Sequence, residues 1–305
     1  MSTQPIRSLR NSAPLNLGLA AFAGDIKIAH SIFALPFAAV AVVIARLPLP
    51  SAVDVLLLLM AMVSARTFAM GVNRWADHRY DVMNPRTSQR AIPAGRLSGS
   101  ECLTYSIIAG LIFVVSAVSL SPLAGALAVP LLAFLGAYSW LKRWTVGVHF
   151  YLGACLAMAP VAVAIALTGT LQPEIALVAI GVCMWTAGFD LLYSLQDLEF
   201  DRKVGLRSIP ARFGVAGSIY ISRACFAVAI VALTAAGVVA NCSWLYFLGV
   251  VVVAAILTAE QVIIARGRDR LDSQLINTAF FKINAWVGVI YLAFTIADVA
   301  MLVSA

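Results

Sequence analysis

The sequence predicts an all-α integral membrane protein with nine transmembrane helices, arranged as two parallel four-helix halves and a ninth helix. Composition is the first reason: 62% of the 305 residues are hydrophobic and only 11% are charged, whereas an ordinary soluble domain carries about 25% charged residues. Segment length is the second reason, because apolar stretches of about 20 residues, long enough to span a bilayer core, recur along the chain.

The apolar stretches define nine expected spans, separated by proline, glycine or charged residues. Backbone at membrane depth must satisfy its own hydrogen bonds, so each span is expected to be a helix. Residues 1–24 are expected to form a cytoplasmic arm and not a cleaved signal peptide. The expected spans lie near 26–46, 52–73, 101–120, 123–141, 149–168, 174–196, 216–240, 243–264 and 278–302.

Lysine and arginine residues gather at alternate ends of these spans, and the opposite ends hold only Arg46. Basic loops stay on the cytoplasmic side of a membrane, so we expect the N-terminus to be cytoplasmic and the C-terminus to lie on the outer side of the inner (plasma) membrane. The net charge of +7 is then mainly a topology signal. Nucleic-acid binding is not expected.

Two long loops on the basic side resemble each other. In each, two aspartates four positions apart are followed by an Arg-x-Ile-Pro-Ala run. A repeat of four helices preserves orientation, so we expect parallel halves of roughly 25–145 and 146–265, and the ninth helix at 278–302, within one domain, 25–305. The matched residues are Asp77, Asp81 and Arg90 in the first loop and Asp197, Asp201 and Arg207 in the second.

The two aspartate motifs have the spacing of a metal–phosphate site. A spacing of four puts Asp77 and Asp81 on one helix face, and the same holds for Asp197 and Asp201. Oxygen ligands without cysteine or paired histidine suit a hard cation such as Mg²⁺, which is usually bound by one or two carboxylates and by substrate phosphates. Solvated salt bridges are the alternative, but two matching copies on one membrane face disfavour it.

Cations that could hold a diphosphate surround the motifs. They are Arg74, Arg79, Arg86, Arg90, Lys142, Arg143, Arg202, Lys203 and Arg207.

The paired NxxxDxxxD and DxxxD motifs resemble those of the UbiA superfamily of intramembrane prenyltransferases. The resemblance runs from residues 27–30 to Asn284 and includes 138–145. Within the superfamily the chain is similar to the 4-hydroxybenzoate polyprenyltransferase group, especially its UbiA-like branch associated with menaquinone formation by the futalosine route. Residues 189–202 carry that similarity most clearly.

The resemblance implies a magnesium-dependent transfer of a polyprenyl group from polyprenyl diphosphate to a hydroxylated aromatic acid. The allylic C–O bond would break and the aromatic ring would attack the resulting cation, with water excluded by the helices. The implied metal ligands are Asp77, Asp81, Asp197 and Asp201, with Asn73 assisting. The implied diphosphate-binding residues are Lys142, Arg143, Arg90, Arg207 and Arg79.

Ionisable residues within the spans are costly and usually functional. Asp190 lies about two turns inside the second motif, and the motif match implies that it orients or deprotonates the acceptor hydroxyl. Arg66 lies inside the second span, where it either meets an aromatic carboxylate or Asp190, or extends to the membrane edge. His149 is expected to cap the fifth span, and Glu260 to pair with Arg266 or another base.

Three alternatives remain. Prenylation of a dihydroxynaphthoate, in menaquinone synthesis, would use the same motifs. A secondary transporter also has repeated helix halves, but its charges should lie near the bilayer midplane, not at the cytoplasmic boundary. A lipid phosphotransferase of the CDP-alcohol type uses aspartate clusters and magnesium, but its DGxxAR-type run is absent from the sequence.

Overall fold

The computed structural model describes residues 15–26, 34–266 and 283–304, and it is entirely helical over these ranges, with no strand. Eight of the described helices are long and apolar enough to cross a membrane. In chain order the elements are α1 (Leu15–Ile26), α2 (Leu35–Ile44), α3 (Ala52–Met83), α4 (Gly99–Leu120), α5 (Pro122–Leu141), α6 (Val148–Thr168), α7 (Pro173–Tyr193), η2 (Ser194–Asp197), α8 (Leu198–Val204), α9 (Ile209–Val239), α10 (Trp244–Arg266) and α12 (Asn284–Ser304).

The prediction of an all-α membrane protein is confirmed, but the count of nine spans is not. At the first expected span the structure describes only α2, which is too short to cross a bilayer alone, and residues 27–33 lie outside the described ranges. Residues 278–282 of the ninth expected span also lie outside them. Helix α1 occupies the end of the segment expected to be an arm and continues two residues beyond it, and it buries Phe22 and Ile26 against α3, α4 and their connection.

Helix α3 extends ten residues beyond the span predicted from hydropathy. It starts at a capping box, in which Ser51 Oγ accepts a hydrogen bond from Asp54 N and Asp54 accepts one from Ser51 N. Its 32 residues would be about 48 Å long, compared with about 30 Å for a bilayer core. The first aspartate motif is therefore a rigid extension of a membrane-length helix.

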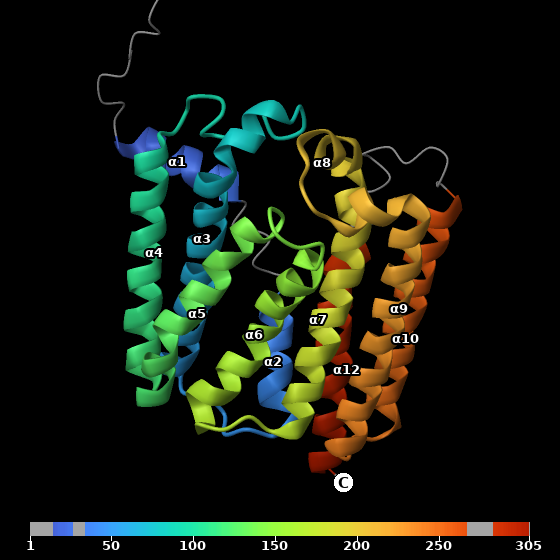
Figure 1. Ribbon diagram of the computed structural model, residues 1–305. Coiled ribbons are helices and arrows are strands. Elements are labelled where there is room, and N and C mark those ends of the chain that lie inside the picture. Colours follow the sequence, from blue (N-terminus) through green and yellow to red (C-terminus); the bar gives the residue numbers. More distant parts are fainter. Residues whose placement is uncertain (1–14, 27–33, 267–282, 305) are drawn as a thin grey trace, which may run out of the picture.

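The second motif is not the uninterrupted helical face that its spacing predicts. Helix α7 ends at Tyr193, the 3-10 turn η2 follows, and α8 carries the chain from Leu198 to Val204. Helix α8 ends at Gly205, whose φ of 73° is in the left-handed region that glycine adopts without strain. This break turns the second motif across the end of the bundle, where α8 lies in Figure 1.

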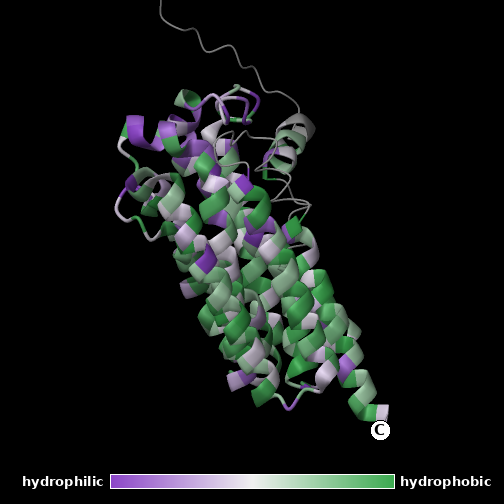
Figure 2. Ribbon diagram, turned by 90° about the vertical axis from the view of Figure 1, so that its right-hand side faces the viewer, coloured by the Kyte–Doolittle hydropathy of each residue, from purple (hydrophilic) through white to green (hydrophobic). Residues whose placement is uncertain are grey.

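The helices form a bundle with lipid-compatible outer faces. Helix α7 packs against α6 and α9, α3 packs against α4 and α5, and α12 packs against α10 and α2 (Figure 1). Polar residues gather at one end of the molecule, while the remainder is mostly hydrophobic (Figure 2). Large apolar side chains such as Val115, Val129 and Val231 are exposed on the helices. The chain is thus a multi-pass integral membrane protein.

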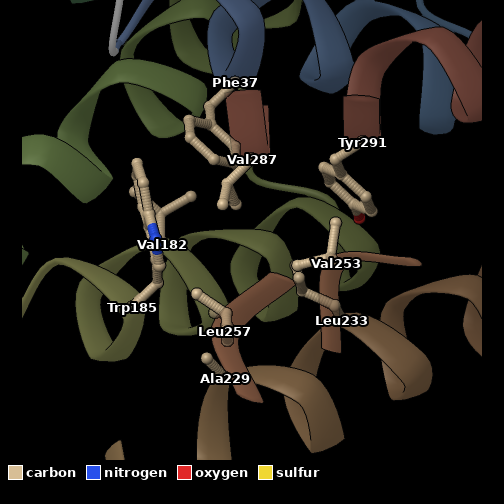
Figure 3. Close-up of a pocket in the computed structure, with 10 residues that line it drawn as sticks. Phe37, Val182, Trp185, Ala229, Leu233, Val253, Leu257, Val287 and Tyr291 are labelled. Carbon is tan, nitrogen blue, oxygen red and sulfur yellow. The ribbon is translucent and has the colours of Figure 1, made fainter. Parts of the chain in front are cut away.

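The interior beneath the polar end is a packed core. Phe37, Trp185 and Tyr291 meet side chains from α9 and α10 around one cavity (Figure 3). The volume of this cavity is about 10 Å³, which is at the lower limit for one water molecule. It is therefore a packing defect and not a substrate pocket.

Helices α6 and α7 approach each other very closely. A Cβ placed on Gly153 of α6 would collide with the carbonyl oxygen of Cys183 on α7. Small residues permit such contacts between membrane helices, where packing is the main source of association. The thiol of Cys183 in turn contacts the carbonyl of Phe150 at 3.6 Å.

Candidate active site

The first motif lies in the last turns of α3. Asn73 Nδ2 donates a hydrogen bond to Asp77 Oδ2 at 2.8 Å, one helical turn away. Arg143, just beyond the end of α5, reaches the other oxygen of Asp77 at 3.2 Å and also donates to the carbonyl of Ala76 at 2.8 Å. The Asp77 side chain keeps 28% of its exposure, so ligands in solution can still reach it.

Asp81 is more deeply enclosed than Asp77. Arg90 folds back from the α3–α4 connection and places Nη1 2.7 Å from Asp81 Oδ1 and 2.9 Å from Oδ2. The Arg90 backbone is held by a run of turns between α3 and α4, including hydrogen bonds to Thr87 O and from Ala94 N. The sequence pairing of Asp81 with the Arg-x-Ile-Pro-Ala run thus corresponds to a direct ion pair.

Asp197 of the second motif is bound by residues from the first half. Arg86 donates to it from Nε at 2.9 Å and from Nη2 at 2.5 Å, and Asn84 Nδ2 donates at 3.0 Å. Burial lowers the pKa of Arg86, but the hydrogen bond and charge of Asp197 outweigh burial and raise this pKa above its ordinary value. This two-pronged contact joins the two motif regions.

Asp201 is 1% exposed. It accepts a hydrogen bond from Ser208 Oγ at 2.9 Å, and Lys142 Nζ lies 3.4 Å away. Arg207, the second-half counterpart of Arg90, does not bind the carboxylate. Its guanidinium donates to the carbonyl of Trp144, and its backbone N–H donates to the carbonyl of Lys142.

All four motif carboxylates therefore carry a basic partner, and two of these partners are consecutive. Lys142 and Arg143 follow α5 directly, and they reach opposite motifs, Lys142 to Asp201 and Arg143 to Asp77. Arg79, predicted to bind diphosphate, is exposed on α3 and joins none of these four pairs. The structure brings four of the predicted cations onto the motif aspartates: Arg86, Arg90, Lys142 and Arg143. Arg74 instead lies 3.5 Å from Asp25, and Arg202 donates to the carbonyl of Ala211.

The carboxylate oxygens of the two motifs suit a hard divalent cation that is also coordinated by phosphate oxygens of a substrate. No group of three or more histidine, cysteine, aspartate or glutamate side chains is arranged to hold a metal within residues 15–26, 34–266 and 283–304. Magnesium does not require one, because it usually keeps waters and binds through one or two carboxylates together with phosphate oxygens. Two pairs of carboxylates, with no thiol or imidazole among them, match that preference.

Asp190 lies about two turns before Asp197, near the end of α7, and its partner is His149 of α6. Oxygen Oδ2 of Asp190 is 2.7 Å from Nδ1 of His149. The prediction that His149 caps its helix is wrong: Gly147 is the N-cap of α6, with no side-chain cap bond. The imidazole turns toward α7 because α6 and α7 pack together there.

Arg66 lies two turns before Asn73 on α3 and is half-buried. Its Nε is buried with no hydrogen-bond partner among the residues that the structure describes.

Within the residues that the structure describes, Glu260 pairs with no base, including Arg266, contrary to the prediction from the sequence. It is 1% exposed and accepts a hydrogen bond from Asn284 Nδ2 at 3.0 Å. The Asn284 oxygen accepts in turn from Trp185 Nε1 at 2.9 Å. The carboxyl thus belongs to a polar link between α7, α10 and α12.

Sequence reasoning missed Asn84, Ser208 and the pairing of His149 with Asp190. Asn84 could have been found from its place three residues after Asp81, as the C-cap of α3. Ser208 could have been found from its place next to Arg207. No local spacing connects His149 to Asp190, because the two residues lie on different helices.

Comparison with known proteins gives one consistent family. The profile described as the UbiA prenyltransferase family matches residues 34–288. A 4-hydroxybenzoate octaprenyltransferase from Alkalilimnicola ehrlichii is 30% identical over 246 residues, covering 80% of this chain and 82% of the relative. Its counterpart from Stutzerimonas stutzeri is 30% identical over 256 residues, covering 82% of each chain.

Solved structures agree. The apo structure of a UbiA homolog from Aeropyrum pernix K1 is similar with a TM-score of 0.80 and 30% identity, covering 89% of this chain and 98% of that one. A UbiA homolog from Archaeoglobus fulgidus, solved with DMAPP and Mg²⁺, shares the fold with a TM-score of 0.66 and 17% identity, covering 92% and 99% of the respective chains.

Proposed function

The chain belongs to the UbiA prenyltransferase family as an aromatic prenyltransferase, and from this premise we propose that it transfers a polyprenyl group from polyprenyl diphosphate to a hydroxylated aromatic acid of the 4-hydroxybenzoate type in quinone synthesis. One observation carries the proposal. Four carboxylates, each paired with a base, lie at one end of the bundle, and Asp190 lies about two turns further inside.

The four paired carboxylates form the diphosphate end of the site. We assign Asp77, Asp81, Asp197 and Asp201 as Mg²⁺ ligands, with Asn73 orienting Asp77. Bound Mg²⁺ would withdraw electron density from the diphosphate as a Lewis acid. Support comes from the oxygen donor set here and from the Mg²⁺ and DMAPP bound by the Archaeoglobus fulgidus relative.

The basic residues have a second role in this scheme. A carboxylate that bound the metal would release its base, which could then bind the phosphate oxygens. Arg143 and Lys142, reaching both motifs from adjacent positions, are the best placed to do this, with Arg90 beside them. Arg79 and Arg207 are assigned the outer rim of the same anion site. Cations at these positions stabilise the charge that develops on the leaving diphosphate.

The acceptor end is assigned to Asp190 and Arg66. Asp190 accepts the hydroxyl proton of the acceptor, which makes the neighbouring ring carbon more nucleophilic. Arg66, whose Nε has no described partner, binds the carboxylate of the aromatic acid through charge-assisted hydrogen bonds. The two groups come from different halves of the chain, and together they would select an aromatic ring that bears both substituents.

The reaction then balances as follows. The allylic C–O bond breaks, and its electron pair leaves with the diphosphate. The allylic carbon forms a C–C bond with the ring carbon beside the hydroxyl. That ring carbon then loses its proton to the departing diphosphate, which restores aromaticity, and Asp190 returns its proton to the phenolic oxygen. The surrounding apolar helices exclude water that would otherwise trap the allylic cation.

The location follows from the same chemistry. We propose that the polar end faces the cytoplasm of a cell whose inner membrane holds the bundle, with the N-terminus inside and the C-terminus outside. The basic residues of this end support this orientation, and diphosphate substrates are then met on the side where they are made.

The test uses purified protein in lipid nanodiscs with a polyprenyl diphosphate and Mg²⁺. Pyrophosphate release is expected only when 4-hydroxybenzoate is added, and EDTA should abolish it until Mg²⁺ is restored. Asp190→Asn should lower turnover by about 10²–10⁴-fold without loss of prenyl diphosphate binding. Release with a dihydroxynaphthoate alone would reassign the acceptor, and no release with any aromatic acid would overturn the proposal.

A further inference from the structure

The pair of His149, which is buried, and Asp190, which is partly exposed, lies outside the proposed metal and diphosphate site. We propose that His149 is a positioning residue for the prenyl transfer: it fixes one oxygen of Asp190 and thereby aims the other at the acceptor hydroxyl. This inference rests on the proposed function, because it takes Asp190 as the group that receives the hydroxyl proton.

The geometry of the pair is one-sided. His149 Nδ1 lies 2.7 Å from Asp190 Oδ2. The imidazole is 0% exposed, while the Asp190 side chain keeps 14% of its exposure. Among the residues that the structure describes, no hydrogen bond or ion pair engages Asp190 Oδ1. The histidine therefore closes the inner side of the carboxylate, and the outer side remains open to a substrate.

The hydrogen bond indicates which ring nitrogen of His149 carries a proton. An ionised carboxylate can only accept, so Nδ1 must donate. Nitrogen Nε2 is buried and has no partner among the described residues. A protonated imidazole would leave a charged N–H donor unpaired in an apolar site, which is costly. The neutral tautomer with its proton on Nδ1 avoids that cost and gives Asp190 one fixed donor.

The close crossing of α6 and α7 explains how the pair forms. Gly153 lies one turn after His149 on the same face of α6, and it meets the backbone of Cys183. Asp190 lies about two turns after Cys183 on α7. Because the two helices touch at Gly153, the short reach of a histidine is enough to contact Asp190. A wider crossing would separate the two side chains.

The same contact makes His149 a poor candidate for a proton relay. A relay needs a second partner on Nε2 to carry the proton away, and none is described there. His149 contributes no helix cap either, since Gly147 occupies that position. Orientation of Asp190 is the role that its one hydrogen bond supports.

The experiment compares His149→Leu, which removes the donor, with His149→Asn, whose amide places a donor close to the position of Nδ1. In nanodiscs, His149→Leu should lower kcat by about 10- to 100-fold, the usual effect of losing a group that orients a site residue. The KM for polyprenyl diphosphate should stay unchanged. His149→Asn should recover most of the lost kcat. In the Asp190→Asn background, His149→Leu should cause no further loss.

Three results would overturn the proposal: a kcat of His149→Leu within twofold of wild type, equal losses in the leucine and asparagine variants, or a full additional loss in the Asp190→Asn background. Where His149→Leu does not fold, His149→Gln takes its place, because its donor is displaced from the Nδ1 position. Wild-type turnover of Asp190→Asn would instead refute the acceptor role within the proposed function. Loss in Asp190→Asn with normal His149→Leu refutes only this inference.

Discussion

The basic partners of the four motif aspartates differ in how firmly they are held. Arg86 binds Asp197 through two nitrogens, and Asn84 adds a third hydrogen bond. Lys142 approaches Asp201 only to 3.4 Å, and Ser208 already satisfies the same oxygen. A cation that is held loosely is the easier one to transfer to a phosphate, so the two bases should serve different purposes.

Removal of these two bases should therefore have different effects. Arg86→Met leaves Asp197 buried with a single amide partner and should lower the free energy of unfolding by about 1–3 kcal/mol. Lys142→Met should leave stability nearly unchanged and raise the KM for polyprenyl diphosphate. Thermal unfolding in detergent and steady-state kinetics separate the two outcomes. Equal stabilities of the two variants would contradict the distinction.

Arg66 offers a test of acceptor recognition. Arg66→Met removes the group assigned to the aromatic carboxylate, and a hydrogen bond to a charged group is worth about 1.5–3 kcal/mol. The KM for 4-hydroxybenzoate should rise roughly 10- to 100-fold. The control is a phenol without a carboxylate, whose transfer rate should be the same in both enzymes. An equal loss with that phenol would exclude carboxylate binding by Arg66.

Whether a site residue could be predicted from the sequence depends on how far away in the chain its partner lies. Asp77, Asp81 and Asn73 could be predicted because one helical turn relates them. Asp190 could be predicted because a carboxylate inside an apolar stretch is conspicuous. The partner of Asp190 could not, since an imidazole on another helix meets it only after α6 and α7 pack.

At the level of elements, hydropathy predicted where helices cross the membrane but not where they end. Helix α3 continues beyond the apolar stretch because no glycine or proline interrupts residues 74–83, and it ends at Asn84, the residue that precedes Pro85. Conversely, η2 interrupts the second motif although its residue spacing alone would allow a continuous helix. Residue spacing thus predicted that the two carboxylates are neighbours. The backbone conformation that positions them depends on packing at the end of the bundle, which spacing does not reveal.

The close contact of α6 and α7 predicts one sensitive position. Gly153→Ala would press a methyl group against the backbone of Cys183, so the helices must separate, at a cost of about 1–3 kcal/mol. Turnover should fall as well, because His149 loses its reach. Gly24→Ala is the matched control, since a Cβ there meets nothing within 4 Å. Equal unfolding temperatures for the two variants in detergent would contradict the tight crossing.

At the level of the whole molecule, the two expected halves meet at their polar ends. Arg86 crosses from the α3–α4 connection to η2, and Lys142 and Arg143 reach from the end of α5 to both motifs. The parallel repeat stays a prediction, but both α3 and α7 lead their aspartates to the same end of the bundle (Figure 1). Each half alone would hold only part of the ion-pair network.

The proposed orientation can be checked by cysteine labelling. Lys203, on α8, lies at the polar end, and Thr170, between α6 and α7, lies at the opposite end; both are exposed. In a background without the five native cysteines, a membrane-impermeant maleimide should label Thr170→Cys in intact cells. It should label Lys203→Cys only after permeabilisation. The reverse pattern would invert the topology, and the cysteine-free background is the control.

If the site binds Mg²⁺ and diphosphate as proposed, the pairing of all four motif carboxylates should couple the binding of these two ligands. If only the metal ion were bound, a carboxylate that contacted it would leave its base without a partner. If only the diphosphate were bound, a base that contacted it would leave its carboxylate without a partner. When both ligands are present, every charge finds a new partner. Each ligand must then raise the affinity for the other by the same factor, as thermodynamic reciprocity requires. We therefore expect the site to bind free pyrophosphate or free metal ion more weakly than it binds either one when the other is present.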